Sequence, residues 1–154
     1  MARRSQPRTL ALGPLDGLLG YRLRRAWNEV RRDFEAELGS LGITRGMIGL
    51  LSVVQANPGI AQGAAARLLD IQRANMVSLV ADMAAAGWIE KGQAPSDRRA
   101  ITLTLTAVGA DVFSAALERV RAHEERMFGR LDAASRARLA AMLAAIGPER
   151  ADAD

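Results

Sequence analysis

The sequence predicts a mainly α-helical protein with one small β-hairpin, and three features carry this prediction. Long stretches repeat apolar residues at spacings of three or four, which is the period of an amphipathic helix. Residues 88–106 instead alternate apolar and polar positions at Ile101, Leu103 and Leu105, which is the period of a half-buried strand. Hydrophobic residues make up 49% of the 154, enough for one globular domain with a sizeable core.

The first helix is predicted over residues 15–39 and ends at Gly39. Its apolar stripe consists of Leu19, Leu23, Ala26, Val30, Phe34 and Leu38. The residues before it, 1–14, contain several arginines and two prolines without helical periodicity, so they predict a flexible basic arm. The last residues, 148–154, predict a flexible tail.

Three further helices are predicted before the hairpin. Thr44 is a suitable N-cap for the first of them, which Asn57-Pro58-Gly59 ends because proline cannot continue a helix. A short helix over 62–69 and another over 72–86 are separated only by Asp70-Ile71, as in a helix-turn-helix. Gly87 is predicted as the C-terminal cap of the second of these.

The hairpin has turn chemistry at its tip, Ala94-Pro95-Ser96-Asp97, which cannot continue either strand. A lone hairpin is only marginally stable, so this one must pack on helices, and its arginines at positions 98 and 99 then have a defined direction. Residues 43–105 therefore predict a winged helix-turn-helix domain, in which the hairpin is the wing.

Two helices are predicted after the hairpin, capped by Thr106 and by Asp132. The buried side of the longer one is expected at Val108, Val112, Ala116, Val120, Met127 and Leu131, and that of the last helix at Leu139, Leu143 and Ile146. Together with the first helix, over 15–39, the helices within 106–147 have apolar faces that one small domain cannot cover. We expect them to be dimerisation helices that pair with a second copy.

Composition excludes several classes of function. The chain has no cysteine and one histidine, which excludes thiol chemistry and makes a zinc site or a catalytic triad improbable. No enzyme, cofactor or metal is expected, because no constellation of acid, base, nucleophile or ligands emerges. The net charge of +4 favours a polyanionic partner. No run of eighteen apolar residues is present, so we expect no membrane partner and a cytoplasmic location.

Four segments between Leu69 and Gly109 form a specific combination in their order and spacing. They are Leu69-Asp70-Ile71, Met83-Ala84-Ala85-Ala86-Gly87-Trp88-Ile89, Asp97-Arg98-Arg99 and Leu103-Thr104-Leu105-Thr106-Ala107-Val108-Gly109. Together these segments resemble the MarR family of bacterial transcription regulators. The resemblance covers residues 15–147 as a single domain and implies a bacterial, cytoplasmic regulator. The sequence departs from the family in two places. The exposed side of the recognition helix, predicted over 72–86, is apolar at Ala74, Val77 and Ala81. Residues 91–96 contain fewer arginines than many wings of the family.

The resemblance implies which residues bind DNA. On the recognition helix the candidates for base contacts are Gln72, Arg73, Asn75 and Ser78. In the wing, Asp97 and Arg99 are candidates for a stiffening ion pair and Arg98 for a DNA contact, although the two arginines could exchange roles. Candidates for phosphate contacts are Thr44, Arg45 and Arg67. For each residue the alternative is an ordinary solvated face, and whether the N-terminal arm contacts DNA stays open.

The resemblance also implies a homodimer on a pseudo-palindromic operator, with a cleft for a small effector between the dimer interface and the winged domain. Candidate cleft residues are Tyr21, Arg22, Arg25, Trp27, Met47, Leu51 and His123. For the basic segment at 21–25 the alternative is an arginine-rich surface, and for His123 it is a satisfied interface histidine. The implied effector is aromatic or anionic, such as an aromatic acid or its coenzyme A thioester.

The function that follows is a ligand-responsive DNA-binding regulator, a repressor that its effector releases from the operator. Two other classes stay open. One is an architectural DNA-binding protein that responds to no ligand, and the other is a winged-helix module that binds another protein and no DNA.

Overall fold

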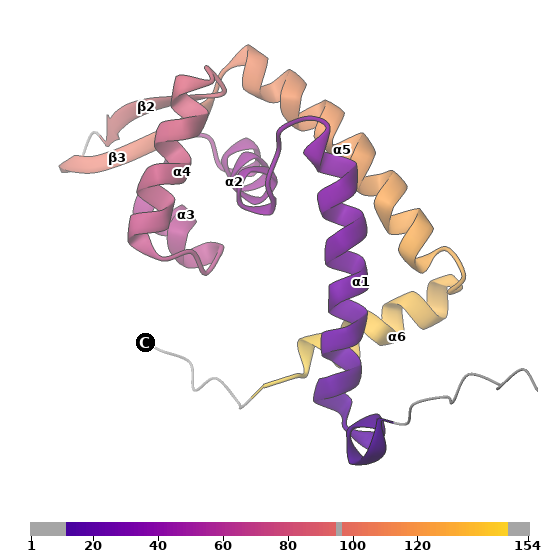
Figure 1. The fold of residues 1–154 in the computed structure, drawn as a ribbon. Coiled ribbons are helices and arrows are strands. Elements are labelled where there is room, and N and C mark those ends of the chain that lie inside the picture. The colour runs from indigo at the N-terminus through magenta and orange to yellow at the C-terminus, as the bar shows by residue number, and fades with distance from the viewer. Residues whose placement is uncertain (1–11, 95–96, 148–154) are drawn as a thin grey trace, which may run out of the picture.

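The computed structural model describes residues 12–94 and 97–147, so most of the predicted arm and the predicted tail lie outside the described residues. The N-terminal part consists of the 3-10 helix η1 (Gly13–Gly17) and helix α1 (Leu19–Gly39). Residues 13 and 14, expected in the flexible arm, therefore begin a short helix, and residues 15–17, expected in the long helix, complete it. In Figure 1 the helix α1 descends from the winged domain to η1 at its far end.

The predicted winged helix-turn-helix is present. It comprises α2 (Arg45–Ala56), α3 (Gln62–Leu68), α4 (Arg73–Ala85) and the antiparallel strands β2 (Ile89–Ala94) and β3 (Asp97–Leu105). One strand was not predicted: β1 (Ile60–Ala61) pairs with β3 and makes the sheet order β1-β3-β2. A two-residue strand is too short to show the alternation of apolar and polar residues that predicts a strand. Because β1 pairs with β3, the hairpin is part of a three-stranded sheet and not alone, as the sequence had suggested. Figure 1 shows the wing extending beside α4.

The last two helices are α5 (Ala107–Phe128) and α6 (Ala133–Ala144). All three predicted N-caps are confirmed, because each cap side chain accepts a hydrogen bond from the backbone N–H three residues later: Thr44 from Met47, Thr106 from Gly109, and Asp132 from Ser135. The bond from Ser135, 2.8 Å long, lowers the pKa of the Asp132 carboxyl.

The junction between wing and α5 depends on two residues. The Thr106 hydroxyl donates to the Gly87 carbonyl at 2.6 Å and accepts from the Gly109 N–H at 2.9 Å, so one side chain joins three segments. At position 109 a Cβ atom would collide with the backbone carbonyl of Trp88. The close approach of α5 to the end of α4 therefore requires glycine there.

Two buried clusters hold the chain together. The larger lies inside the winged domain and includes Leu50, Leu51, Val54, Met76, Val80, Met83 and Leu103. The smaller, Leu38, Ile43 and Ala116, joins α1, the segment just before α2, and α5. The recognition helix, α4, is thus connected to the long helix α1 by continuous packing through α2 and α5.

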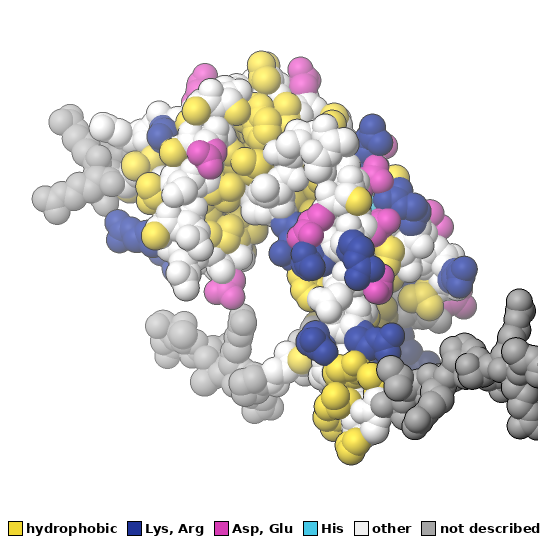
Figure 2. All heavy atoms as spheres, in the orientation of Figure 1, with side chains coloured by type: hydrophobic (Ala, Val, Ile, Leu, Met, Phe, Trp, Pro, Cys, Tyr) yellow, Lys and Arg dark blue, Asp and Glu magenta, His cyan; other side chains and the backbone are white. Residues whose placement is uncertain are grey.

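The expected buried side of α5 is wrong at Val108, and the apolar side of α6 is not covered within the single chain. Val108 is 56% exposed, because Gly109, one position later, takes the side of the helix that contacts Trp88. Leu131, Leu143 and Ile146 are also exposed, and α6 has no buried residue. Large apolar side chains gather as well on η1 and the start of α1, where Leu19 is 82% exposed. Figure 2 shows them at the lower end of the molecule.

None of the described helices is both long enough and apolar enough to cross a membrane.

Candidate nucleic-acid interface and effector region

The turn between α3 and α4 has a sharply defined geometry. Asp70 has a left-handed backbone with φ +51°, and the Ile71 N–H donates to the Ala66 carbonyl at 2.9 Å. Short polar residues such as aspartate tolerate this conformation better than most side chains. The turn redirects the chain so that α4 starts immediately, at Arg73, after Gln72.

The C-terminal end of α4 is equally well defined, because Gly87 caps it as predicted. Its φ is +74°, and the N–H groups of Gly87 and Trp88 donate to the carbonyls of Ala84 and Met83. This paired arrangement is a Schellman motif, which satisfies the last carbonyls of a helix. Both ends of α4 are therefore fixed before it meets any partner.

The faces of α4 follow from its buried residues. Met76, Val80 and Met83 point into the core, so the opposite side is presented to solvent. The four base-contact candidates, Gln72, Arg73, Asn75 and Ser78, are all exposed. Gln72 occupies the N-cap position, but its side chain makes no capping hydrogen bond, so its amide is available to a partner.

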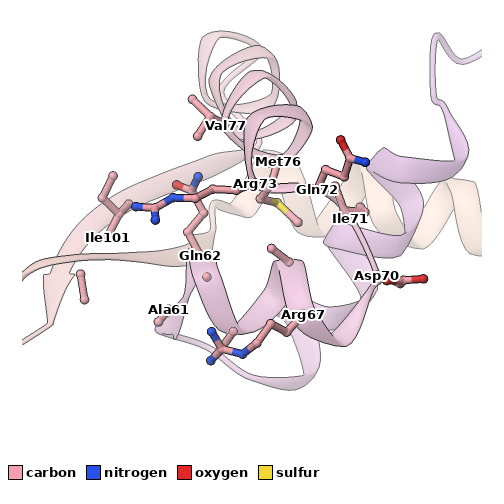
Figure 3. A pocket seen from close by; sticks show the side chains of 14 residues that line it. Ala61, Gln62, Arg67, Asp70, Ile71, Gln72, Arg73, Met76, Val77 and Ile101 are labelled. Atoms are coloured by element: carbon pink, nitrogen blue, oxygen red, sulfur yellow. The ribbon is translucent and has the colours of Figure 1, made fainter.

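A hollow of about 810 Å³ lies where α3, α4 and β3 meet. In Figure 3 Arg73 reaches across it toward Ile101, Gln62 lies between, and Arg67 lies on the α3 side. None of the ion pairs among the described residues involves Arg67 or Arg73. The two arginines outnumber Asp70, the acidic residue that also lines the hollow, so this concave face is suitable for a polyanion.

The other candidates for DNA contacts either make contacts within the protein or have side chains that the structure does not describe. The Thr44 hydroxyl caps α2, and the Arg45 guanidinium lies 4.9 Å from the centre of the Trp27 ring, so both contribute to the α1–α2 junction. Asp97, Arg98 and Arg99 lie within β3, but their side chains are outside the described part of the chain. The wing ion pair and wing DNA contact therefore stay predictions.

Among the effector candidates, Arg22, Arg25 and Trp27 are exposed on α1, and Tyr21 is half-buried there. Two cation–aromatic pairs lie along this helix: Arg24 is 5.0 Å from the centre of the Tyr21 ring, and Arg45 is over Trp27. Arg22 is turned toward η1, where it donates to the Asp16 carbonyl at 2.8 Å. A second hollow, of about 550 Å³, lies between the end of α1 and the start of α2 and is lined by Arg45 and Phe34, among others.

Met47 is half-buried, whereas Leu51 and His123 are core residues in this structure and line neither hollow. His123 is 2% exposed, and its Nδ1 atom lies 2.7 Å from the Asp33 carboxylate, with the Phe34 ring edge-on to the imidazole. The alternative of a satisfied histidine fits this placement. Neither Leu51 nor His123 is therefore accessible from solvent in this structure.

Sequence reasoning missed the ionic network around this histidine. Arg126 of α5 bonds both Asp33 and Glu37 of α1, and Arg119 also reaches Glu37, at 3.3 Å. The hydrogen bond from Arg126 and then that from His123 lower the pKa of the Asp33 carboxyl. A signal was present in the sequence, since acidic residues at positions 33 and 37 of one helix and basic residues at positions 119 and 126 of the other recur at helical spacing. Among the described residues no cluster of three or more potential metal ligands occurs.

Comparison with known proteins places these features in context. A sequence profile described as MarR family matches residues 41–100. A protein of Thauera aromatica, described as a transcriptional regulatory protein for the hcr operon, is 31% identical over 135 residues, 87% of this chain and 81% of that protein.

Two solved structures of the transcriptional repressor CouR are also similar. One, bound to a 23-mer DNA duplex, has a TM-score of 0.84 and 34% identity, and the match covers 88% of this chain and 96% of that one. The other, bound to p-coumaroyl-CoA, has a TM-score of 0.80 and 31% identity, and the match covers 92% and 100%.

Proposed function

The chain belongs to the MarR family of transcriptional regulators, and from this premise we propose that its effector is an aromatic acid or the coenzyme A thioester of one. The family consists of regulators rather than enzymes. The protein is a DNA-binding repressor that responds to a ligand and acts as a homodimer. The proposal concerns which residues of this chain bind DNA, the second copy and the effector.

We assign DNA binding to the exposed face of α4, the hollow beside it and the wing. Both ends of α4 are fixed, so its exposed side chains enter a groove with little loss of conformational freedom. Arg67 and Arg73 bracket the hollow and are suited to phosphate oxygens, while Gln72 and Asn75 are suited to base edges. The wing arginines would add contacts on one side of the groove.

We assign dimerisation to η1, α1 and α6. The exposed leucines of these elements, with Ile146 just after α6, form the apolar surface that a second copy would cover, and the start of α1 holds the most exposed of them, Leu19. Because α5 joins α6 to the winged domain, a change in this interface would alter the spacing of the two recognition helices.

The observation that carries the effector proposal is the pairing of arginine with aromatic rings along α1. Arg24 over Tyr21 and Arg45 over Trp27 place cations and flat apolar surfaces side by side. A coenzyme A thioester of an aromatic acid offers the matching groups, namely a ring, several phosphates and an adenine. The CouR structure with p-coumaroyl-CoA, 31% identical to this chain, supports that ligand class.

Arg45 couples the effector region on α1 to the DNA-binding domain. It is the first residue of α2, while its aromatic partner Trp27 is on α1. An anion that competes for this guanidinium would loosen the α1–α2 junction. The effector acts as a switch only if it binds the conformation without DNA better than the conformation with DNA.

A thermal-shift screen tests the proposal. The probes are benzoate, 4-hydroxybenzoate, p-coumarate, their coenzyme A thioesters and free coenzyme A. A ligand at about 100 times its Kd stabilises the folded protein by about 2.7 kcal/mol, which such a screen resolves. We expect the thioesters or the acids to raise the melting temperature of the wild type and to lose this effect in Trp27→Ala and Arg25→Ala.

The matched control is Arg32→Ala, which removes an α1 arginine paired with Glu29 at 2.8 Å. This variant should respond as the wild type does. A wild type that no probe stabilises, or a response that survives in both Trp27→Ala and Arg25→Ala, contradicts the proposal. The first outcome favours a DNA-binding protein that responds to no ligand of this class.

A further inference from the structure

Part of the solvent-facing side of the recognition helix, α4, is apolar. With Met76, Val80 and Met83 buried, the exposed polar residues of this helix are Arg73, Asn75, Ser78 and Asp82, whereas Ala74, Val77 and Ala81 form an exposed apolar strip. The valine is 54% exposed. Single exposed apolar residues are ordinary on protein surfaces, but this one is in the second turn of the helix that enters the groove.

The neighbours of Val77 enlarge the apolar surface. Ala74 and Ala81 precede and follow it by three and four positions, so all three lie on adjoining parts of one helix face. Ile101 of β3 is 45% exposed and lines the same hollow as Val77. Figure 3 shows the two side chains on the same side of the hollow, with Arg73 extending between α4 and β3.

The charges around this surface indicate its occupant. A protein partner could use an apolar helix face, but it would have to bring anions to meet Arg67 and Arg73, which have no described ion-pair partner. Duplex DNA meets both requirements at once, since phosphates border the groove and apolar groups line part of its floor. The surface is also continuous with the DNA-reading positions Gln72, Asn75 and Ser78.

Only one group in the major groove is apolar, the C5-methyl of thymine. Valine and alanine cannot hydrogen-bond to a guanine, cytosine or adenine edge, so they discriminate through that methyl or not at all. We propose that Val77, with Ala74 beside it, is a specificity-determining residue that contacts a thymine methyl group in each operator half-site. The inference rests on the proposed assignment of DNA binding to α4.

Removal of the methyl from the DNA isolates this contact. Replacing thymine with uracil leaves base pairing and both hydrogen-bonding edges unchanged. A lost contact of one methyl group with an apolar side chain should weaken binding about fourfold, by the free energy of burying one such group. The same loss should be absent when the protein already lacks the valine methyls.

The wild-type homodimer is first used to select a duplex from a pool of random sequence. Each thymine of one selected half-site is then replaced singly with uracil, and affinities are measured by fluorescence anisotropy for the wild type, Val77→Ala and Val108→Ala. The control valine is on α5 and 56% exposed, so it matches Val77 in chemistry and exposure. Circular dichroism melting checks that all three proteins are folded.

We expect at least one uracil substitution to weaken wild-type and Val108→Ala binding about fourfold and to leave Val77→Ala unaffected. Selected sites without thymine, tolerance of every substitution, or equal losses in the wild type and Val77→Ala overturn the inference while DNA binding stands. If no duplex is enriched, the DNA-binding assignment fails and the inference fails with it.

Discussion

The Nδ1 atom of His123 on α5 lies 2.7 Å from the carboxylate of Asp33 on α1, although the two residues are 90 positions apart in the sequence. The imidazole is buried and the carboxylate also bonds Arg126. This contact fixes the two long helices against each other at the level where α1 approaches the winged domain. It therefore links the proposed dimerisation and effector helix to the helix that leads out of the wing.

The Asp33 contact predicts acid sensitivity. The pKa of this carboxyl is lower in the folded protein than its ordinary value of 3.8, first because Arg126 and then because His123 bonds it. A lowered carboxyl pKa stabilises the fold above the unfolded pKa, and this stability is lost as pH falls through the folded pKa. Denaturant titrations between pH 6 and pH 3 should show a steeper loss of unfolding free energy for the wild type than for Asp33→Asn.

The control for that titration is Asp111→Asn, which removes an exposed carboxylate from α5. It should keep the steep acid dependence of the wild type. Equal acid dependence in the wild type and Asp33→Asn means that the contact adds nothing to stability.

Gly109→Ala should be destabilising, because the new methyl collides with the Trp88 carbonyl and the junction must shift. Forcing extra atoms into a packed site costs about 1 to 3 kcal/mol. Gly39→Ala, at the end of α1 with nothing within 4 Å of the added atom, is the matched control and should be neutral or slightly stabilising. Urea unfolding measures both, and similar free energies for the two variants would refute the packing argument.

Leu19→Asp should dissociate the homodimer. Leu19 is 82% exposed in the single chain, and a buried aspartate without a partner is strongly unfavourable at an apolar interface. Size-exclusion chromatography with light scattering should give the monomer mass for Leu19→Asp and the dimer mass for Leu68→Asp, which changes a leucine of α3 that is 66% exposed. A dimer in both variants would place the interface elsewhere.

The wing arginines should contribute to affinity through phosphates. Arg98→Ala and Arg99→Ala are each expected to weaken binding to a selected duplex and to flatten the dependence of log Kd on log salt concentration by about one unit of slope per lost phosphate contact. Anisotropy titrations at several salt concentrations measure this. If neither variant changes the affinity or the slope, the wing assignment is wrong.

Local chemistry made much of the fold predictable. Thr44, Thr106 and Asp132 cap helices through contacts only three residues away, and the alternation in 101–105 defines β3 by itself. Such features depend on short-range geometry, which the sequence displays directly.

Long-range features were not predictable in the same way. The pairing of β1 with β3 and of Asp33 with His123 depends on packing between distant segments, and Val108 faces solvent only because Gly109 takes the contact with Trp88. In the candidate site, the exposure of the α4 residues agrees with the DNA-reading face expected from the sequence. The burial of Leu51 and His123 was not visible, because their helical periodicity does not say what covers them.

The most direct test of the account is release of the protein from DNA. The wild-type homodimer is bound to a fluorescent duplex selected from a random pool, and an aromatic coenzyme A thioester, the free acid or coenzyme A alone is added. We predict that the thioester or the acid raises the apparent Kd for the duplex by about tenfold or more, which corresponds to a coupling free energy of about 1.4 kcal/mol. An apparent Kd that none of these compounds changes would contradict the account.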